Sequence, residues 1–300
     1  MLFRSSGITK ILTTYTLPRL DYVAADPITT NSMQLNISGN YSYVNILDSS
    51  SNVVTNLVTT NSYNVTGLQP NWTYSYVFMC YNFNNLPGNT LTLNAITLPT
   101  LYTATAIPTV NSIYLDISGD FSYVNIKDSS ANTIANNVTA NYYNNTGLTT
   151  NRTYSYVIHS YNASDKSGNI INVTTTTLPL LNYVNVEQVT TDSVILSFGG
   201  LYSYVNILDS SANVTVPHII DVSYEIIYLN TNASYLLYAT SFNNLDYSGN
   251  TINVYFTTLP VLSSLSISNI ASNSMQLDFR SEEHTSELQS LRHLVCRLLL

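Results

Sequence analysis

Carboxylates recur at one position of the sequence: Asp48, Asp128 and Asp209 each open the tripeptide Asp-Ser-Ser. Carboxylates in a loop are ligands that hard cations such as Ca²⁺ accept. One carboxylate per loop, however, falls far short of the roughly six to eight oxygen ligands that Ca²⁺ needs. An aspartate that opens a turn commonly accepts a hydrogen bond from a nearby backbone N–H. We therefore expect these three side chains to close turns rather than to bind a metal ion.

The histidines and the native cysteine lack partners for catalysis or metal binding. His159 and His218 have no Cys, His or carboxylate at ligand spacing, so both are expected to be isolated and solvent-facing. Cys80 is replaced by Ser160 and Ser241 at the equivalent positions of the repeats described below, which excludes a shared disulfide framework. The sequence also lacks G-x-S-x-G, H-E-x-x-H and glycine-rich phosphate-loop motifs. It therefore predicts no catalytic residue, no cofactor and no metal site.

Aromatic residues form the remaining set with chemical potential. Tyrosines on an exposed sheet face, with Asn and Thr beside them, can stack on sugars or anchor a partner protein. The same rings can instead pack across neighbouring strands and only stabilise the sheet, which is the interpretation that we favour. The candidate contact face comprises Tyr43, Tyr81, Tyr123, Tyr161, Tyr204 and Phe242.

The elements that position these residues are clearest between Ser62 and Pro99. Apolar and polar residues alternate over Tyr74 to Cys80 and over Leu91 to Ala95, and an Asn/Pro/Gly-rich turn at 82–89 joins the two runs. Period-two alternation bounded by turn residues predicts two half-buried antiparallel strands. By the same parity, Cys80 should face the core as a small apolar side chain.

A corner precedes the first of these strands. Leu68, Pro70 and Tyr74 form the pattern L-x-P-x-x-x-Y, in which the leucine closes one strand and the proline fixes the bend. The tyrosine ring can then lie in the core while its hydroxyl reaches back to the corner backbone, an arrangement known as a tyrosine corner. Together with Tyr63 and Val65, these residues resemble the end of a fibronectin type III module, a seven-strand sandwich of the immunoglobulin kind. The resemblance implies a role in spacing or in protein contacts.

Three copies of the corner occur, at steps of 80 and then 81 residues. Self-similarity at a fixed period marks an array of like units, and a period of about 80 residues exceeds any solenoid repeat, so each unit should be a small domain. The second and third copies carry Thr150 and Thr231 in place of the corner proline. The predicted corner residues are Leu68, Pro70, Tyr74, Leu148, Tyr154, Leu229 and Tyr235.

The repeats predict a tandem array of seven-strand sandwiches joined without linkers. Each module ends in Thr-Leu-Pro and passes straight into the next first strand, so proline should stiffen the junction into a semi-rigid rod. The expected divisions are 1–5 an adapter-like artefact, 6–18 the last strand of a preceding module, 19–99 module one, 100–179 module two, 180–260 module three, 261–279 the first strands of a further module, and 280–300 a second adapter-like artefact.

Both ends resemble translated sequencing-adapter sequence. The stretch from Arg280 begins R-S-E-E-H-T-S-E-L-Q-S, and Leu2 to Ser5 resembles the translated reverse complement of the same adapter. A rival interpretation of the C-terminal end is an amphipathic helix with Ser281 as its N-cap. We exclude both ends from fold reasoning, and we expect the remainder to be a window cut from a longer array.

Within module one, alternation also assigns the other strands. The first strand is expected near Tyr22 to Ala25, before Pro27. An unpaired amide in the core would cost about 1–3 kcal/mol, so Asn45 should face outwards and its neighbours Val44 and Ile46 inwards. The remaining expected strands are S-M-Q-L-N-I-S with Met33, Leu35 and Ile37 inward, Val53 to Val58, and one that carries Tyr63 and Val65.

Charge limits the function classes. The two ends contribute four of the 9 basic and three of the 17 acidic residues, which leaves five basic against fourteen acidic residues and a net charge of −9. This balance argues against nucleic acid, which needs clustered Lys and Arg, and against an anionic membrane surface. No run of about 18 apolar residues occurs, so no membrane span is predicted.

The sequence therefore favours a non-enzymatic structural or adhesive repeat region of a cell-surface, secreted or virion protein, with protein or glycan contacts. Low charge with abundant Asn, Ser, Thr and Tyr is typical of extracellular and viral β-rich repeats. The alternative is a set of accessory modules, spacer or carbohydrate-binding, of a polysaccharide-degrading enzyme whose catalytic domain lies outside this stretch.

Overall fold

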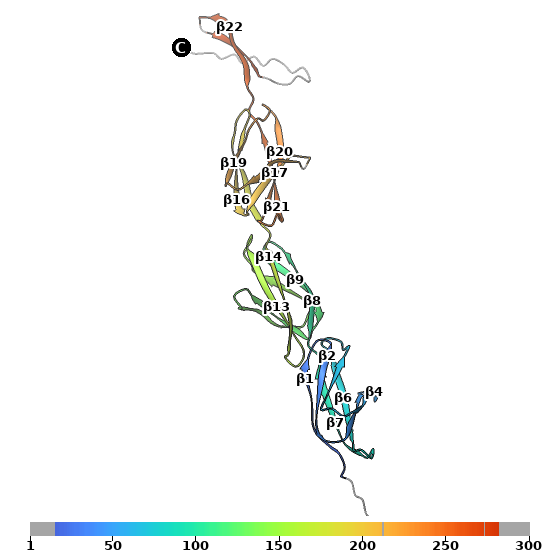
Figure 1. The fold of residues 1–300 in the computed structure, drawn as a ribbon. Helices are drawn as coiled ribbons and strands as arrows, with labels where there is room; N and C mark the ends of the chain where they lie inside the picture. The colour runs from blue at the N-terminus through green and yellow to red at the C-terminus, as the bar shows by residue number, and fades with distance from the viewer. Residues whose placement is uncertain (1–15, 212, 273, 282–300) are drawn as a thin grey trace, which may run out of the picture. The chain divides into compact units, whose positions relative to one another are not determined.

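The structure is a computed structural model that describes residues 16–211, 213–272 and 274–281. Every regular element in these ranges is a β-strand, and the strands follow one another in three groups and a final hairpin (Figure 1). Most of the expected adapter-like ends and of the expected 6–18 strand lie outside the described residues. The part of the chain that is described contains no helix long and apolar enough to cross a membrane.

The first group of strands forms a sandwich of two antiparallel sheets. One sheet has the order β1-β2-β5 and the other the order β4-β3-β6-β7. The strands are β1 (Arg19–Ile28), β2 (Ser32–Asn40), β3 (Tyr43–Asp48), β4 (Val53–Val58), β5 (Ser62–Thr66), β6 (Thr73–Tyr81) and β7 (Pro87–Ile96).

The second and third groups repeat this topology. Their sheets have the orders β12-β9-β8 with β11-β10-β13-β14, and β15-β16-β19 with β18-β17-β20-β21. The second group is β8 (Thr100–Pro108), β9 (Ser112–Asp120), β10 (Tyr123–Asp128), β11 (Thr133–Val138), β12 (Tyr142–Thr146), β13 (Thr153–Tyr161) and β14 (Ser167–Thr176). The third is β15 (Leu180–Val189), β16 (Val194–Leu201), β17 (Tyr204–Leu208), β18 (Val214–Ile219), β19 (Ser223–Ile226), β20 (Ser234–Phe242) and β21 (Ser248–Thr257). The chain is an all-β tandem array of seven-strand sandwiches.

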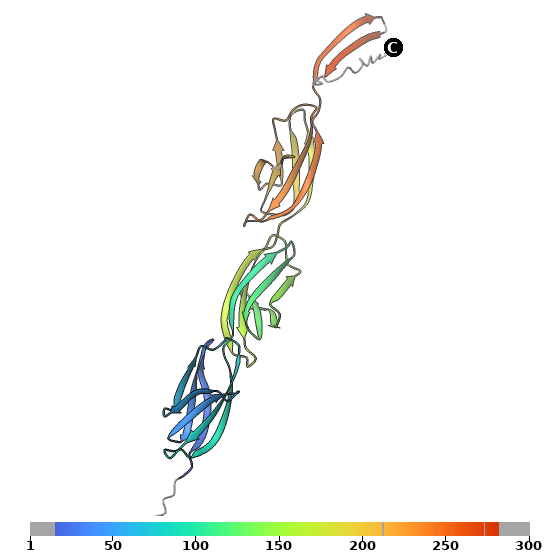
Figure 2. The ribbon, with the colours of Figure 1, turned by 90° about the vertical axis from the view of Figure 1, so that its right-hand side faces the viewer.

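A two-stranded hairpin follows the third sandwich. It consists of β22 (Leu262–Ala271) and β23 (Ser274–Ser281), which pair antiparallel (Figure 2). Met275 occupies the position of an inward residue of β2, yet its side chain is 42% exposed. Among the described residues this hairpin has no second sheet to cover it, so the alternation of β23 produces no buried core.

Alternating residues of facing sheets fill each core, as the sequence predicts. In the first sandwich, Met33, Leu35 and Ile37 of β2 face Val44 and Ile46 of β3, and all five are at most 3% exposed. The equivalent residues of the other sandwiches are equally buried: Ile113, Leu115, Ile117, Val124, Ile126, Val194, Leu196, Phe198, Val205 and Ile207. Burial of these apolar faces is the main stabilising contribution to each sandwich.

The first strand is longer than the sequence predicts. β1 begins at Arg19 and continues through Pro27 to Ile28, rather than ending before the proline. Proline is tolerated there because β1 is an edge strand of its sheet, and because its register against β2 shifts between Ala25 and Ile28.

The hairpin formed by β6 and β7 has a shorter turn than expected. β7 begins at Pro87, so Gly88 and Asn89 lie in the strand and not in the turn. The side chain of Asn82 closes the shorter turn, because its Oδ1 accepts hydrogen bonds from the backbone N–H groups of Asn84 and Leu86, both at 3.0 Å. Asn162 and Asn243 close the equivalent turns in the same way.

Candidate functional site

The corner tyrosines have the same hydrogen bond in all three sandwiches. The hydroxyl oxygen of Tyr74 accepts the backbone N–H of Gln69 at 2.8 Å, and Tyr154 and Tyr235 accept the equivalent N–H groups at 2.9 and 2.7 Å. Leu68, Leu148 and Leu229 are half-buried beside them. The bond persists where threonine replaces Pro70, so the proline is not required for it.

A threonine that sequence reasoning missed ties the same corner from the other side. The hydroxyl of Thr97 donates to the carbonyl of Gln69 at 2.6 Å and accepts the N–H of Trp72 at 3.0 Å. Thr177 and Thr258 make the equivalent contacts. The sequence signal for this contact is the threonine of each Thr-Leu-Pro, because this threonine recurs at the same steps as the corner tyrosines. We name the segments 67–72, 147–152 and 228–233 the corner segments.

The candidate contact face consists of stacked aromatic pairs. Tyr43 and Tyr81 lie opposite each other on β3 and β6, with ring centroids 5.0 Å apart and planes within 9°. Tyr123 with Tyr161, and Tyr204 with Phe242, stack at 5.1 Å. Five of these rings are half-buried and one, Tyr204, is buried at 9% exposure. This geometry is the cross-strand packing that stabilises a sheet.

In each pair, the hydroxyl of the tyrosine on β3, β10 or β17 also makes a hydrogen bond. Tyr43 donates to the side-chain oxygen of Asn85 at 2.9 Å, and Tyr123 and Tyr204 donate to the carboxylates of Asp165 and Asp246 at 2.8 Å. The hydrogen bond to Asp165 raises the pKa of Tyr123, because removing the proton would leave two adjacent negative charges. Burial, and then the hydrogen bond to Asp246, raises the pKa of Tyr204.

The histidines are not isolated, contrary to expectation. His159 is half-buried and its ring lies 5.3 Å from that of Tyr161, while the ring of exposed His218 lies 4.2 Å from that of Tyr204. His159 and Tyr161 lie two residues apart on β13 and therefore share one face of the sheet. His218 has a left-handed backbone, with φ of 58°. Among the described residues, no group of three or more His, Cys, Asp or Glu side chains is arranged to bind a metal ion.

The repeated aspartates close turns. The Oδ1 atom of Asp48 accepts the backbone N–H groups of Ser50 and Asn52 at 2.8 and 2.9 Å, and its Oδ2 atom accepts the Asn52 amide at 2.9 Å. Asp128 and Asp209 repeat all three contacts. Hydrogen bonds from the asparagine four residues on hold the pKa of each carboxyl below its ordinary value. Both oxygens of each carboxylate are therefore already engaged within the turn.

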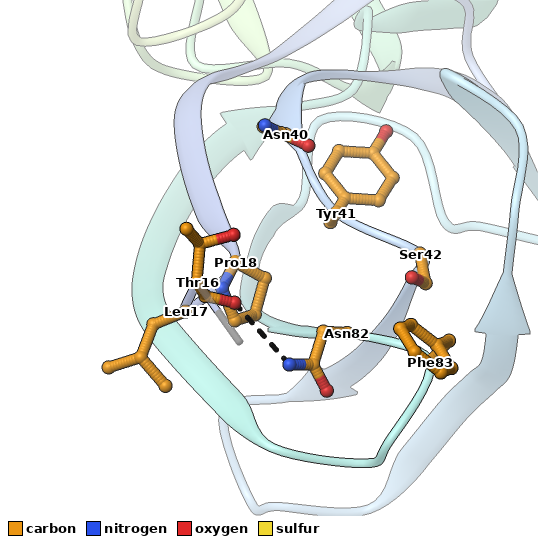
Figure 3. Close-up of a pocket in the computed structure, with 8 residues that line it drawn as sticks. All are labelled: Thr16, Leu17, Pro18, Asn40, Tyr41, Ser42, Asn82 and Phe83. Carbon is orange, nitrogen blue, oxygen red and sulfur yellow. Dashed lines mark hydrogen bonds between the residues drawn. The ribbon is translucent and has the colours of Figure 1, made fainter. Parts of the chain in front are cut away.

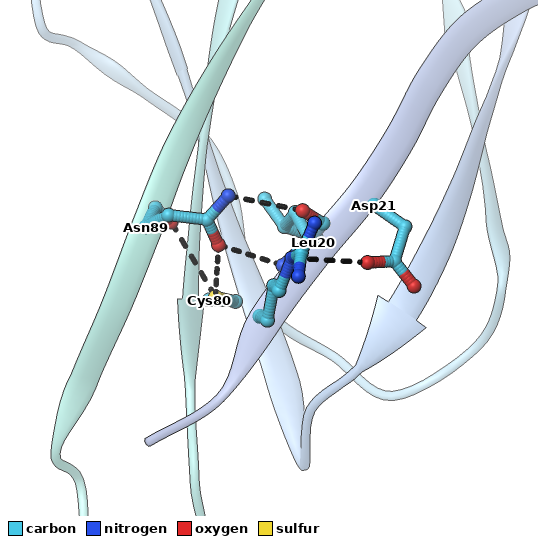
Figure 4. A network of polar contacts seen from close by, with 5 residues as sticks. Leu20, Asp21, Cys80 and Asn89 are labelled. Carbon is cyan, nitrogen blue, oxygen red and sulfur yellow. Dashed lines mark hydrogen bonds and ion pairs between the residues drawn. The ribbon is translucent and has the colours of Figure 1, made fainter.

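An asparagine latch, also missed from sequence, joins the first strand to the last. Figure 4 shows the Asn89 amide of β7 directed at Leu20 of β1, where its Oδ1 accepts the N–H at 2.7 Å and its Nδ2 donates to the carbonyl at 2.9 Å. The neighbouring Gly88 is required, because a Cβ there would lie 2.0 Å from the carbonyl oxygen of Pro18. Arg19 and Asp21 form an exposed ion pair beside the latch, which contributes little.

A pocket of about 180 Å³ opens beside the start of the first sandwich. In Figure 3 the Asn82 amide points to the carbonyl of Thr16, which it reaches at 3.4 Å, and the ring of Tyr41 stands on the opposite side. The lining residues are Thr16, Leu17, Pro18, Asn40, Tyr41, Ser42, Asn82 and Phe83.

No family model and no curated protein matches the sequence. The chain is similar in structure to tandem fibronectin domains of two chicken proteins. The FN1–FN3 domains of chicken CNTN1 align over 81% of this chain and 100% of theirs, with 12% identity and a TM-score of 0.30. A two-domain fibronectin type III segment of chicken tenascin aligns over 53% of this chain and 99% of its own, with 12% identity and a TM-score of 0.37.

Proposed function

We propose that this chain is a structural repeat region that serves as a semi-rigid spacer in a cell-surface, secreted or virion protein. One observation carries the proposal: the junction segment 97–99, between the first and second sandwiches, is bonded on both sides. The Thr97 hydroxyl is tied to the corner before it, and the Thr97 carbonyl accepts the Nδ2–H of Asn162, after it, at 3.1 Å. A junction bonded in this way loses conformational freedom that a flexible linker keeps.

Electron–electron distance measurements between two spin labels test the proposed stiffness. The labels are attached at Ser50→Cys and Ser211→Cys, which are exposed turn positions of the first and third sandwiches. All samples carry Cys296→Ser, because Cys296 is the second cysteine of the sequence and would also take a label. We expect a narrow distance distribution that broadens when Thr97, Leu98 and Pro99 are replaced by Gly-Ser-Gly. The control replaces Ser129, Ser130 and Ala131, which lie in a turn, with the same tripeptide. Equal widths for the native and the junction-replaced chain would contradict the proposal.

The finer part of the proposal concerns contacts with proteins or glycans through the aromatic pairs. Their half-burial and stacking favour packing as the main role, and the ring edges that remain accessible are the surface a partner would meet. Changing Tyr43 and Tyr81 to serine separates the two roles. Loss of a folded first sandwich supports packing, whereas loss of binding to a glycan array by a chain that stays folded supports the contact role.

A further inference from the structure

An asparagine of the corner segment contacts a serine of the sandwich that follows in the sequence, and it does so twice. The Ser122 hydroxyl donates to Oδ1 of Asn71 at 3.1 Å, and Nδ2 of Asn151 lies 3.4 Å from the Ser203 hydroxyl. Asn71, Asn151 and the equivalent Asn232 all have a left-handed backbone, with φ of 49°, 54° and 51°. Asparagine adopts this conformation more readily than most residues. The contact is thus a repeated feature of the array.

The serines and asparagines that form this contact are more buried than the equivalent residues that do not. Ser122 and Ser203 are half-buried, whereas the equivalent Ser42 of the first sandwich is exposed. The two asparagines in contact are half-buried as well, whereas Asn232 is exposed. Ser42 therefore occupies the position of Ser122 and Ser203 without an asparagine beside it among the described residues.

Ser42 lies in the pocket of Figure 3, and the pocket is built like the junction between the first and second sandwiches. Asn82 donates to the carbonyl of Thr16 there as Asn162 donates to that of Thr97. The tripeptide Thr-Leu-Pro is identical at the two places. The pocket also has an apolar rim of Leu17 and Phe83, which are 68% and 71% exposed.

We infer that this pocket is a receptor for the corner segment of a further sandwich of the same kind, joined in tandem ahead of Thr16-Leu17-Pro18. The amide of its left-handed asparagine bonds the Ser42 hydroxyl, and the corner covers Leu17 and Phe83. The inference rests on the proposed role as a repeat array. Its tests report contact at single serines and not the stiffness of the chain, so each can fail without the other.

Thiol labelling of the full chain tests the contact where both halves are present. All variants carry Cys296→Ser, and Cys80, which is 1% exposed, reports unfolding if it reacts. We expect Ser122→Cys to react more slowly than Ser42→Cys. Asn71→Ala should accelerate the reaction at Ser122→Cys about two- to tenfold, because it removes the amide that covers this side chain and can accept the weak S–H hydrogen bond of the thiol. The reaction at Ser42→Cys should be unchanged. No acceleration at Ser122→Cys would overturn the inference.

A fusion tests the pocket itself. An extra copy of residues 19–99 is placed ahead of Arg19, so that its own Thr-Leu-Pro replaces 16–18. Ser42→Cys in the original copy should then react about two- to tenfold more slowly, and Asn71→Ala in the added copy should remove the slowing. An unchanged rate at Ser42→Cys overturns the inference. So does concentration-dependent slowing in the chain without the fusion, because it would identify a second chain as the occupant.

Discussion

Asn89 binds Leu20 through both polar groups of its side-chain amide, as the backbone of a paired strand would. The two residues are 69 positions apart, and the same relationship joins Asn169 to Leu101 and Asn250 to Leu181. The first strand of each sandwich is paired with one sheet, and this amide attaches its beginning to the other. The latch therefore closes the sandwich at the end where the chain enters.

Removing the latch should loosen the start of β1. Asn89→Ala leaves the N–H and carbonyl of Leu20, a residue 2% exposed, without their partner. We expect the free energy of unfolding of the first sandwich to fall by about 1–3 kcal/mol. Hydrogen exchange of the Leu20 amide should accelerate. Asn94→Ala, an exposed position of the same strand, is the matched control, and equal exchange in the two variants would refute the role of the latch.

Stability should fall on acidification because of the turn aspartates. Their folded-state pKa values lie below the ordinary value of 3.8. The stabilisation is thus present above the unfolded pKa and is lost as the pH falls through the folded one. The triple variant Asp48→Asn, Asp128→Asn, Asp209→Asn should be less stable at neutral pH and lose less stability between about pH 5 and pH 2. Urea unfolding across this pH range measures both effects. If the native chain and the triple variant lost equal stability on acidification, the stabilising role of the turn aspartates would be contradicted.

Tyr228 is strained, and relieving it should stabilise the third sandwich. Its φ is 65°, where the other copies have Gly67 and Gly147 at 74° and 72°. Its side chain is 90% exposed, so truncation removes little packing. We expect Tyr228→Gly to raise the free energy of unfolding by about 1 kcal/mol. Tyr224→Gly, in β19, should lower it, and a destabilising effect of Tyr228→Gly would show that the ring has an unrecognised contact.

The second sandwich should unfold first. Asn145 occupies the position in β12 at which Val65 and Ile226 pack against the cores of the other sandwiches. An amide at this position buries less apolar surface than an aliphatic side chain does, so the second sandwich gains less from the hydrophobic effect. Asn145→Val should therefore raise the free energy of unfolding of the second sandwich by about 1 kcal/mol, and raise its melting midpoint with it. Val65→Asn should lower that of the first, and calorimetry in which the second sandwich melts last would contradict the prediction.

The strands and the number of sandwiches could be predicted from the sequence. Alternation of apolar and polar residues identifies each strand locally, and the repeat period can be counted along the chain. The orientation of β3 followed from one residue: Asn45 faces out, and its Oδ1 accepts the backbone N–H of Leu57 at 3.0 Å. That partner could not be predicted, since it depends on the left-handed backbone of Leu57.

The latch and the threonine contacts were missed for a different reason. Repetition shows that Asn89 and Thr97 recur in every copy, but it does not reveal which backbone groups they meet. Those groups lie 69 and 28 residues away for Leu20 and Gln69. The stacked pairs were predicted as sharing one face, while their hydroxyl partners Asn85, Asp165 and Asp246 emerged only from the turn geometry.

Hydrogen exchange of the full chain with and without Ile46→Ala tests most directly whether the sandwiches are separate folding units. Ile46 is fully buried in the first core, and its truncation should cost about 2–5 kcal/mol. We predict that protection falls throughout β1 to β7 and is unchanged in β8 to β21. A comparable loss of protection in the second and third sandwiches would show one continuous cooperative core and contradict the account.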